Sequence, residues 1–535
     1  MSGLKNNSQA GQTPPFGLSF KQQLNKVYRW YTLAFFLFVA LLAVLEQAGL
    51  PREWIGFIFL ITTIGLYAAI GIMSRTTDAT EYYVAGRRVP AVYNGMATGA
   101  DWMSAASFIG LAGTLYLTGY SGLAFILGWT GGYCLVALLL APYLRKFGQF
   151  TIPDFLGERY GGHLPRLLGV MAAILCSFIY VVAQIYGVGL ITSRLIGVAF
   201  ELGIFLGLGG ILVCSFLGGM RAVTWTQVAQ YIVIIVAYLI PVVWLSVKQT
   251  GSPVPQAVFG YQLEKVTTKE KELRQDPKEL EVQRLFAALS VDLAEKLKDP
   301  AAALLRDKAK AEGELALLRQ ENASLADVSA AEKTLSSLPR TASAAEETWG
   351  RRKTEADTKS LPLNGMPPHA AQFAGDPDGD AAAQKAFNES RRNFLALVFC
   401  LMVGTAALPH ILMRYYTVPS VKAARESVTW SLFFIFLLYF TAPALAVMVK
   451  FEVFNVLIGT PFDQLPAWVS AWNKVDPTLL SVTDVNRDGL LQLNEMSIGG
   501  DIIVLATAEI AGLPYVISGL VAAVGLAAAL STADG

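Results

Sequence analysis

The sequence is poor in charged residues, in cysteine and in histidine. Only 16% of its 535 residues are Asp, Glu, Lys or Arg, against about a quarter in a typical soluble domain. The formal net charge of +1 provides no basic surface for nucleic acid. Four cysteines stand far apart in apolar segments, where we expect them to be buried, and three histidines form no group. This spacing excludes a disulfide framework and a zinc site.

Long apolar runs take the place of charge. Hydrophobic residues make up 54% of the chain, and the mean hydropathy is +0.46. A helix of roughly 20 residues crosses the hydrocarbon core of a bilayer. The first run begins near Trp30, too late and too long for a cleavable signal peptide. We therefore expect an all-α polytopic membrane protein with ten spans, at about 30–48, 54–73, 92–117, 121–143, 166–195, 200–218, 223–247, 393–413, 427–449 and 502–535.

Two polar stretches interrupt the spans. The longer one is rich in Ala, Glu and Lys, with leucines at helical spacing from Leu285 to Leu297, and is expected to be a water-soluble helical insert. Its later part, 341–380, is expected to be irregular. The last apolar run continues to Gly535, so a truncated chain is expected. The predicted segments are a cytoplasmic tail (1–29), spans one to seven (30–249), the insert (250–391), spans eight and nine (392–450), a polar loop (451–501) and an incomplete span ten (502–535).

Basic residues mark every second loop. They follow spans two, four, six and eight, at Arg75, Arg87, Arg88, Arg145, Lys146, Arg159, Arg166, Arg221, Arg414, Lys422 and Arg425. Because short cytoplasmic loops carry an excess of Lys and Arg, the N-terminus is predicted to be cytoplasmic. The insert and the 451–501 loop are then extracytoplasmic, and the insert is a candidate contact for an extracytoplasmic protein. The predicted location is the cytoplasmic (inner) membrane of a bacterium.

Two spans have sequences that disfavour a continuous helix. The third contains NGMATGADWMSAASFIGLAG, which is crowded with small residues and holds Asp101. The eighth is interrupted by Gly404 and Pro409. An acid at membrane depth usually marks an ion or substrate path, and paired interrupted helices point to a binding site near the midplane. Five spans separate the two, so they would begin two inverted repeats, the first at 92–247.

Five motifs also resemble the sodium:solute symporter family, and within it the cation/acetate and monocarboxylate symporters. They are EYYVAGRRVP, DWMSAASFIG, TIPDFLGERY, GGMRAVTWTQVAQ and GTAALPHILMRYYTVPSVKAARES. The resemblance covers about 55–250 and 393–535 and leaves the insert and the polar loop unexplained. It implies a leucine-transporter-like core of five-plus-five inverted repeats and sodium-coupled transport.

The resemblance also implies a sodium site between the third span and the last. Its ligands would be the carbonyl groups of Ala100, Met103 and Ala528 and the hydroxyl groups of Ser531 and Thr532. Neutral oxygens from unwound helix suit a hard cation. From spacing alone, the alternative is that both hydroxyls bond back to their own helix.

The substrate site is predicted at the break in the third span. Serines at the start of a half-helix suit a carboxylate, because the helix dipole favours an anion there. Asp101 has two interpretations, a cap of the second half-helix or a proton or cation relay. The predicted substrate-binding residues are Asp101, Trp102, Ser104, Ser107 and Gln184. Aromatic residues in spans also serve as packing, and His410 is either a structural partner or a pH-sensitive group.

The polar loop contains DVNRDGLLQLNE, which fits the calcium loop of an EF-hand. The predicted ligands are Asp484, Asn486, Asp488, the carbonyl of Leu490 and Glu495. The alternative is an acidic surface turn. Outside the cell, such a loop would hold Ca²⁺ as a structural clamp.

The sequence as a whole predicts a secondary transporter in the lipid bilayer, not an enzyme. Its substrate is predicted to be a small molecule, a monocarboxylate such as acetate, carried with Na⁺. Two alternatives stay open. One is a symporter-like sensor domain of a larger signalling protein, and the other is proton-coupled transport.

Overall fold

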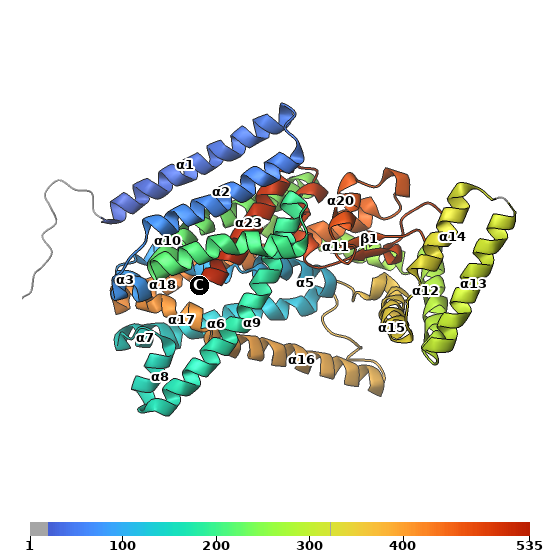
Figure 1. Cartoon of the computed structure of the whole chain (residues 1–535). Coiled ribbons are helices and arrows are strands. Elements are labelled where there is room, and N and C mark those ends of the chain that lie inside the picture. Colours follow the sequence, from blue (N-terminus) through green and yellow to red (C-terminus); the bar gives the residue numbers. More distant parts are fainter. Residues whose placement is uncertain (1–19, 322) are drawn as a thin grey trace, which may run out of the picture.

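The computed structural model describes residues 20–321 and 323–535, apart from the side chains of residues 194, 210–214 and 326; residues 1–19 of the predicted tail lie outside the described residues. The described chain is a bundle of long helices with a helical lobe at one end (Figure 1). Seven of its helices are long and apolar enough to cross a membrane, or eight if one bent pair counts as a single span. The predicted all-α polytopic fold with a helical insert is confirmed.

The N-terminal helices lead into the first break. They are α1 (Phe20–Gln47), α2 (Arg52–Met73), α3 (Ala79–Val84) and η1 (Ala85–Arg87). The third predicted span then forms α4 (Ala91–Trp102), η2 (Ala106–Gly110) and α5 (Leu111–Thr118). The α-helix stops at Met103, whose ψ of 60° is not helical, and η2 is a turn of π-helix. The small residues of this stretch thus belong to a helix that opens in its middle.

The next helices complete the first half of the bundle. They are η3 (Gly119–Gly122), α6 (Leu123–Leu135), η4 (Val136–Leu140), α7 (Ala141–Phe147), α8 (Ile152–Tyr160), α9 (His163–Ile196) and α10 (Phe200–Thr250). Predicted spans six and seven both fall within α10. The chain changes direction at Gly219, which has φ 51° and ψ −144°. Only glycine adopts this conformation readily.

The insert forms a lobe of helices. Its elements are α11 (Pro255–Leu273), α12 (Pro277–Lys296), α13 (Pro300–Gln320), α14 (Leu325–Ser337), α15 (Ala342–Lys359) and η5 (Pro362–Gly365). Pro277 and Pro300 stand at the first helical positions of α12 and α13, where proline is tolerated. The expectation of irregular structure over 341–380 is wrong for its first half. There α15 is ordered because Ala345 and Trp349 pack against Leu293 and Leu304.

The second half contains the bent pair and the polar loop. The pair is α16 (Ala381–Ala406) and α17 (Pro409–Met413), bent by 44° and extended by η6 (Arg414–Tyr416). Two further helices follow, α18 (Val421–Tyr439) and α19 (Ala442–Glu452). The polar loop and chain end form η7 (Val453–Leu457), η8 (Phe462–Gln464), α20 (Ala467–Val475), β1 (Leu480–Val482), η9 (Leu493–Glu495), β2 (Met496–Ile498), α21 (Ile502–Leu505), α22 (Thr507–Ile510) and α23 (Tyr515–Asp534). Strands β1 and β2 pair antiparallel.

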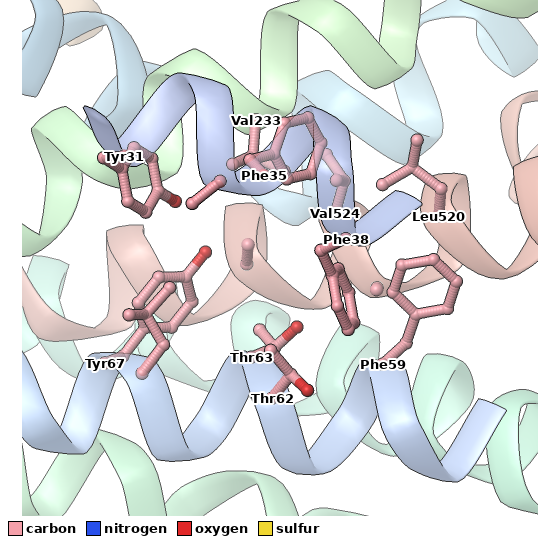
Figure 2. Close-up of a pocket in the computed structure, with 14 residues that line it drawn as sticks. Tyr31, Phe35, Phe38, Phe59, Thr62, Thr63, Tyr67, Val233, Leu520 and Val524 are labelled. Atoms are coloured by element: carbon pink, nitrogen blue, oxygen red, sulfur yellow. The ribbon is translucent and has the colours of Figure 1, made fainter. Parts of the chain in front are cut away.

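The centre of the bundle is α23, and α1 lies at its edge (Figure 1). Helix α23 packs against α2, α9, α10 and α4, and nearly all of its residues are buried. A cavity of about 240 Å³ lies between α1, α2, α10 and α23, with Phe35 and Phe38 on one side and Thr62 and Tyr67 on the other (Figure 2). Cys176 and Cys400 are exposed rather than buried, because α9 and α16 turn these faces outward.

Candidate functional site

The two helix breaks face each other across α9. Tyr180 on α9 donates a hydrogen bond from its hydroxyl to Ser104 Oγ at 3.4 Å. The ring of Tyr180 also packs against the ring of His410 at the start of α17, with centroids 5.0 Å apart. Ser104 lies in the unwound residues of the first break and His410 directly follows the second. One side chain therefore joins two segments that are about 300 residues apart in the sequence.

The hydroxyl groups of α23 contact the end of α4. Ser531 Oγ donates to the carbonyl of Ala100 at 2.8 Å, and Thr532 Oγ1 donates to the carbonyl of Asp101 at 2.8 Å. Both hydroxyls also lie within reach of Ala528 O in their own helix, at 2.8 and 3.3 Å. The structure thus gathers four of the five predicted sodium ligands and adds the Asp101 carbonyl. Met103 is buried at the C-cap of α4, outside this set of hydrogen bonds.

Asp101 forms a buried ion pair with Arg414. Arg414 donates to Asp101 Oδ2 from Nε at 3.2 Å and from Nη2 at 3.1 Å, and neither side chain is exposed. The cap interpretation of Asp101 is therefore wrong, since the amides that begin the second half-helix bond to Gln184 and Ser104 instead. The expectation that Arg414 is a loop charge is also wrong. A buried arginine is stable only with such a partner.

The ion pair continues into a chain of hydrogen bonds that ends at α23. Arg414 also donates to the side-chain oxygen of Gln227 and, at 3.3 Å, to Thr224 Oγ1, both on α10. Gln227 Nε2 donates in turn to the carbonyl of Ser531 at 2.7 Å. Every side chain in this hydrogen-bonded series is buried. The first break, the second break and the hydroxyl-bearing end of α23 therefore share one polar network.

The predicted substrate residues lie around the first break and are buried. Trp102 Nε1 donates to Tyr439 Oη at 2.6 Å, so this aromatic side chain has a polar partner rather than packing alone. Ser107 Oγ donates to the carbonyl of Trp102 at 2.7 Å. Gln184 Oε1 accepts from the backbone N of Ala105 at 2.9 Å. These hydrogen bonds stabilise the unwound residues, which lack the backbone hydrogen bonds of a continuous helix.

One donor at the break is unsatisfied. Gln184 is 1% exposed, and its Nε2 has no hydrogen-bond partner within the described part of the chain. The other end of the same amide is fixed on Ala105. A buried donor without a partner costs about 1–3 kcal/mol, so such a group calls for an acceptor. The break therefore presents a hydrogen-bond donor that a bound solute with oxygen atoms can satisfy.

The EF-hand-like loop is folded by its own hydrogen bonds. Asp484 Oδ2 accepts from the backbone N of Gly489 at 3.1 Å, and Glu495 Oε1 accepts from that of Val485 at 2.6 Å. Asp488 is turned toward Lys278 of the insert, with 2.9 Å between Oδ2 and Nζ. No group of three His, Cys, Asp or Glu among the described residues is arranged to hold a metal. The calcium assignment stays a prediction.

The same loop docks on the insert. Glu279 on α12 accepts hydrogen bonds from the backbone N atoms of Leu493 and Asn494, at 2.5 and 3.3 Å. Asn494 Nδ2 donates to the carbonyls of Lys359 and Leu361, at 2.6 and 2.8 Å. Burial raises the pKa of Glu279 to about 7, although the two amide bonds act in the opposite direction. The insert and the polar loop are therefore one structural unit.

Sequence reasoning missed the partners of the predicted residues. Arg414 follows a predicted span in the sequence, so its charge predicts a position in a loop, and its partner Asp101 is more than 300 residues away. Tyr180 and Tyr439 are aromatic residues within apolar spans. Nothing in their local sequence distinguishes a tyrosine of a binding site from a tyrosine that only packs between helices. Their roles depend on contacts between distant helices.

Comparisons of the sequence with known proteins agree on one family. A model of the sodium:solute symporter family matches residues 82–302. An uncharacterized symporter of Cupriavidus necator is 51% identical over 523 residues, covering 96% of this chain and 75% of that protein. A monocarboxylic acid transporter of Corynebacterium glutamicum is 26% identical over 396 residues, covering 73% of this chain and 54% of that protein.

Among solved structures, the chain is similar to a Na⁺-coupled sialic acid symporter in a substrate-bound outward-open state. The two share 14% identity, with a TM-score of 0.47, over 90% of this chain and 70% of that one. This likeness is too distant to assign residues. The sequence identity to the symporter of Cupriavidus necator extends over nearly the whole chain. This multi-pass membrane protein therefore belongs to the sodium:solute symporter family, a family of transporters rather than enzymes.

Proposed function

We propose that the protein is a Na⁺-coupled symporter of a small monocarboxylate. The single observation that carries this proposal is the meeting of α23 with the broken end of α4, where two hydroxyls and three carbonyls converge beside an unsatisfied donor. Carbonyls and hydroxyls are neutral oxygen ligands, which suit Na⁺. Family membership supports sodium coupling, and the monocarboxylic acid transporter among the relatives supports the substrate class.

Sodium would bind between Ser531, Thr532 and the carbonyls of Ala100, Ala528 and Asp101. Each hydroxyl now donates its proton to a carbonyl, which leaves its lone pairs free to ligate a cation. The carbonyl of Met103, the remaining member of the predicted set, is proposed as a further ligand. Because Ser531 also belongs to the network of Gln227 and Arg414, an ion at this place would stabilise the packing of α23 against both breaks.

The carboxylate would bind at the unwound residues of the first break. Gln184 Nε2 is the unsatisfied donor at this place. The hydroxyls of Ser107 and Tyr180 now donate to Trp102 O and Ser104 Oγ and would have to turn to donate to a solute. Trp102 and Tyr439 close one side. Ser104 and Ser107 offer only short hydroxyl side chains and no large polar group that could reach the several hydroxyls of a sugar, so a small solute such as acetate is proposed. Asp101 is occupied by Arg414 and repels an anion less than a free carboxylate would.

The test is uptake of radiolabelled acetate into proteoliposomes that contain the protein. With an inward Na⁺ gradient, uptake is expected to exceed that in choline several-fold. The double variant Ser531→Ala, Thr532→Ala is expected to lose this stimulation. Ser518→Ala is the matched control, because Ser518 is a buried serine on the same helix but away from the break. Na⁺ is also expected to raise the Tm of the parent, but not of the double variant, since a ligand at 100 times its Kd adds about 2.7 kcal/mol.

The alternatives make different predictions. Uptake that depends on a pH gradient and not on Na⁺ would show that the coupling ion is the proton. His410 would then be the candidate proton-binding group. A sodium-dependent Tm without uptake of any small carboxylate would favour the sensor interpretation. An unchanged Na⁺ response in the double variant would reject the proposed ion site.

We also propose that the 484–495 loop binds Ca²⁺ as a structural ion. The support is the spacing of Asp484, Asn486, Asp488, Leu490 and Glu495, and binding requires Asp488 to leave Lys278. Calcium at millimolar concentration is expected to raise the Tm of the protein, and Asp484→Asn is expected to abolish this effect. Asp463→Asn, in η8 outside the loop, serves as control. Equal Tm values in Ca²⁺ and in chelator would rule the site out.

A further inference from the structure

The insert meets the membrane helices at a buried charged cluster. Glu270 on α11 pairs with Lys450 on α19, with 3.5 Å between Oε1 and Nζ, and the two side chains are 2% and 0% exposed. The backbone N of His369 donates to both oxygens of Glu270, at 3.1 and 3.2 Å. His369 Nδ1 lies 3.4 Å from Lys450 Nζ. Separating such a pair in a buried place is costly, so the cluster fixes the insert on α19.

We call the segment that contains His369, residues 366–380, the strap. It leads from the lobe of the insert to the start of α16 (Figure 1). At its first contact, the backbone N of Tyr120 donates to the carbonyl of His369 at 3.0 Å. A Cβ at Gly119 would lie 2.5 Å from that carbonyl, so the strap touches backbone where α5 ends. The strap is therefore bonded to the second half of the first broken helix.

The strap also packs on the second broken helix. Phe373 contacts Tyr120 and Phe394, with ring centroids 5.8 Å apart in each case. Tyr120 and Phe394 stack on each other at 5.7 Å. Because Tyr120 follows α5 and Phe394 lies on α16, one aromatic cluster joins the same-side halves of both broken helices. The strap thus connects α5, α16 and α19.

A cavity of about 630 Å³ lies under the strap. His369 and Ala370 of the strap and Phe259 and Leu263 of α11 line one part of it. Tyr439, which accepts the hydrogen bond of Trp102, lines another. The cavity therefore extends from the insert to a residue that touches the first break. The native Cys134 on α6 also lines it.

We propose that the strap and Glu270 form a gate at the insert end of the transporter. This inference rests on the transport function proposed above. Access to the break from this end requires α5 and α16 to move relative to α19, and the strap holds all three. Release of Glu270 from Lys450 would open the gate, and its return would close it. A buried ion pair suits this purpose because it is either made or broken, which gives two discrete states.

The test measures how fast Cys134 reacts with a membrane-impermeant thiol reagent added at the insert side. The protein carries Cys176→Ala, Cys214→Ala and Cys400→Ala, so that Cys134 is the only thiol. Glu270→Gln keeps the shape of the side chain but removes its charge, and is expected to raise the reaction rate about fivefold or more, as a shift of one or two kcal/mol would. Glu272→Gln, on the same helix with a side chain 60% exposed, is expected to leave the rate unchanged.

A second variant covers the case in which Glu270→Gln does not fold. Phe373→Ala weakens the strap without touching a charge and is expected to raise the rate as well. If Cys134 reacts in both variants at the same rate as in Glu272→Gln, the proposal of a gate is rejected. The labelling needs neither Na⁺ nor substrate, so a failed transport assay and a failed gate are separate results.

Discussion

At the scale of residues, the central feature is one arginine held by one aspartate. Arg414 bonds to Asp101, Thr224 and Gln227, and all four side chains are buried. Asp101 Oδ1 has no hydrogen-bond partner within the described part of the chain, so one acceptor of the ion pair is unsatisfied. The network connects the first break, the segment after the second break, α10 and the end of α23.

Removal of the arginine alone is expected to be severe. Arg414→Met should lower the free energy of unfolding by about 3–5 kcal/mol, because it leaves Asp101 charged and unpaired in a buried place. Combining Arg414→Met with Asp101→Asn should restore part of the loss. Thermal unfolding in detergent measures both, with the exposed Arg425→Met as control. Equal stability of the single and double variants would show that the charge of Asp101 is not the cause.

At the scale of elements, glycine positions decide where helices turn. The predicted boundary between spans six and seven, at 219–222, coincides with the change of direction at Gly219 inside α10. At Gly219 the backbone has φ 51° and a Cβ would lie 2.5 Å from the carbonyl of Tyr82. The contact with the region before α4 therefore depends on the absence of a side chain.

Gly219→Ala is expected to destabilise the protein by about 1–3 kcal/mol from backbone strain, with an added cost from the contact with Tyr82. Gly209→Ala in the same helix meets no atom within 4 Å and should be neutral or slightly stabilising. Thermal unfolding of the two variants side by side measures the difference. Similar Tm values would mean that the bend tolerates a side chain.

At the scale of the whole molecule, the insert and the polar loop form one structural unit. Glu279 is the buried carboxylate between them. Burial raises its pKa from 4.5 to about 7, and burial also raises the pKa of Glu495. The folded protein thus holds a proton on Glu279 at pH values at which the unfolded chain has lost it. The stability from this group is fully present below about pH 4.5 and is lost as the pH rises through about 7.

The docking of the loop on the insert is therefore expected to tighten from pH 8 to pH 6. Each unit of pKa shift corresponds to about 1.4 kcal/mol. Hydrogen exchange at the amides of Leu493 and Asn494, corrected for the intrinsic pH dependence, measures the effect. Glu279→Gln should remove it, while the exposed Glu281→Gln should not. Protection that grows with pH in the parent would contradict the expected direction.

The sequence by itself determined the class of the protein. Long apolar runs predict membrane helices because a helix must match the thickness of the bilayer. Glycine, serine and threonine around Asp101 predict an interrupted helix because these residues have low helix propensity. The family resemblance singles out Ser531 and Thr532, and the structure brings them to the carbonyls of Ala100 and Asp101. Helical spacing in the insert likewise predicts helices, since that pattern is local.

Only the tertiary structure decided which groups are partners. Arg414 and Asp101 are more than 300 residues apart, and nothing local tells a buried arginine from a loop charge. The order of α15, the contact of Glu279 with η9 and the strap over α5 all arise from packing between distant segments. Pairing of this kind depends on distances in the folded molecule, which a pattern along the chain does not contain.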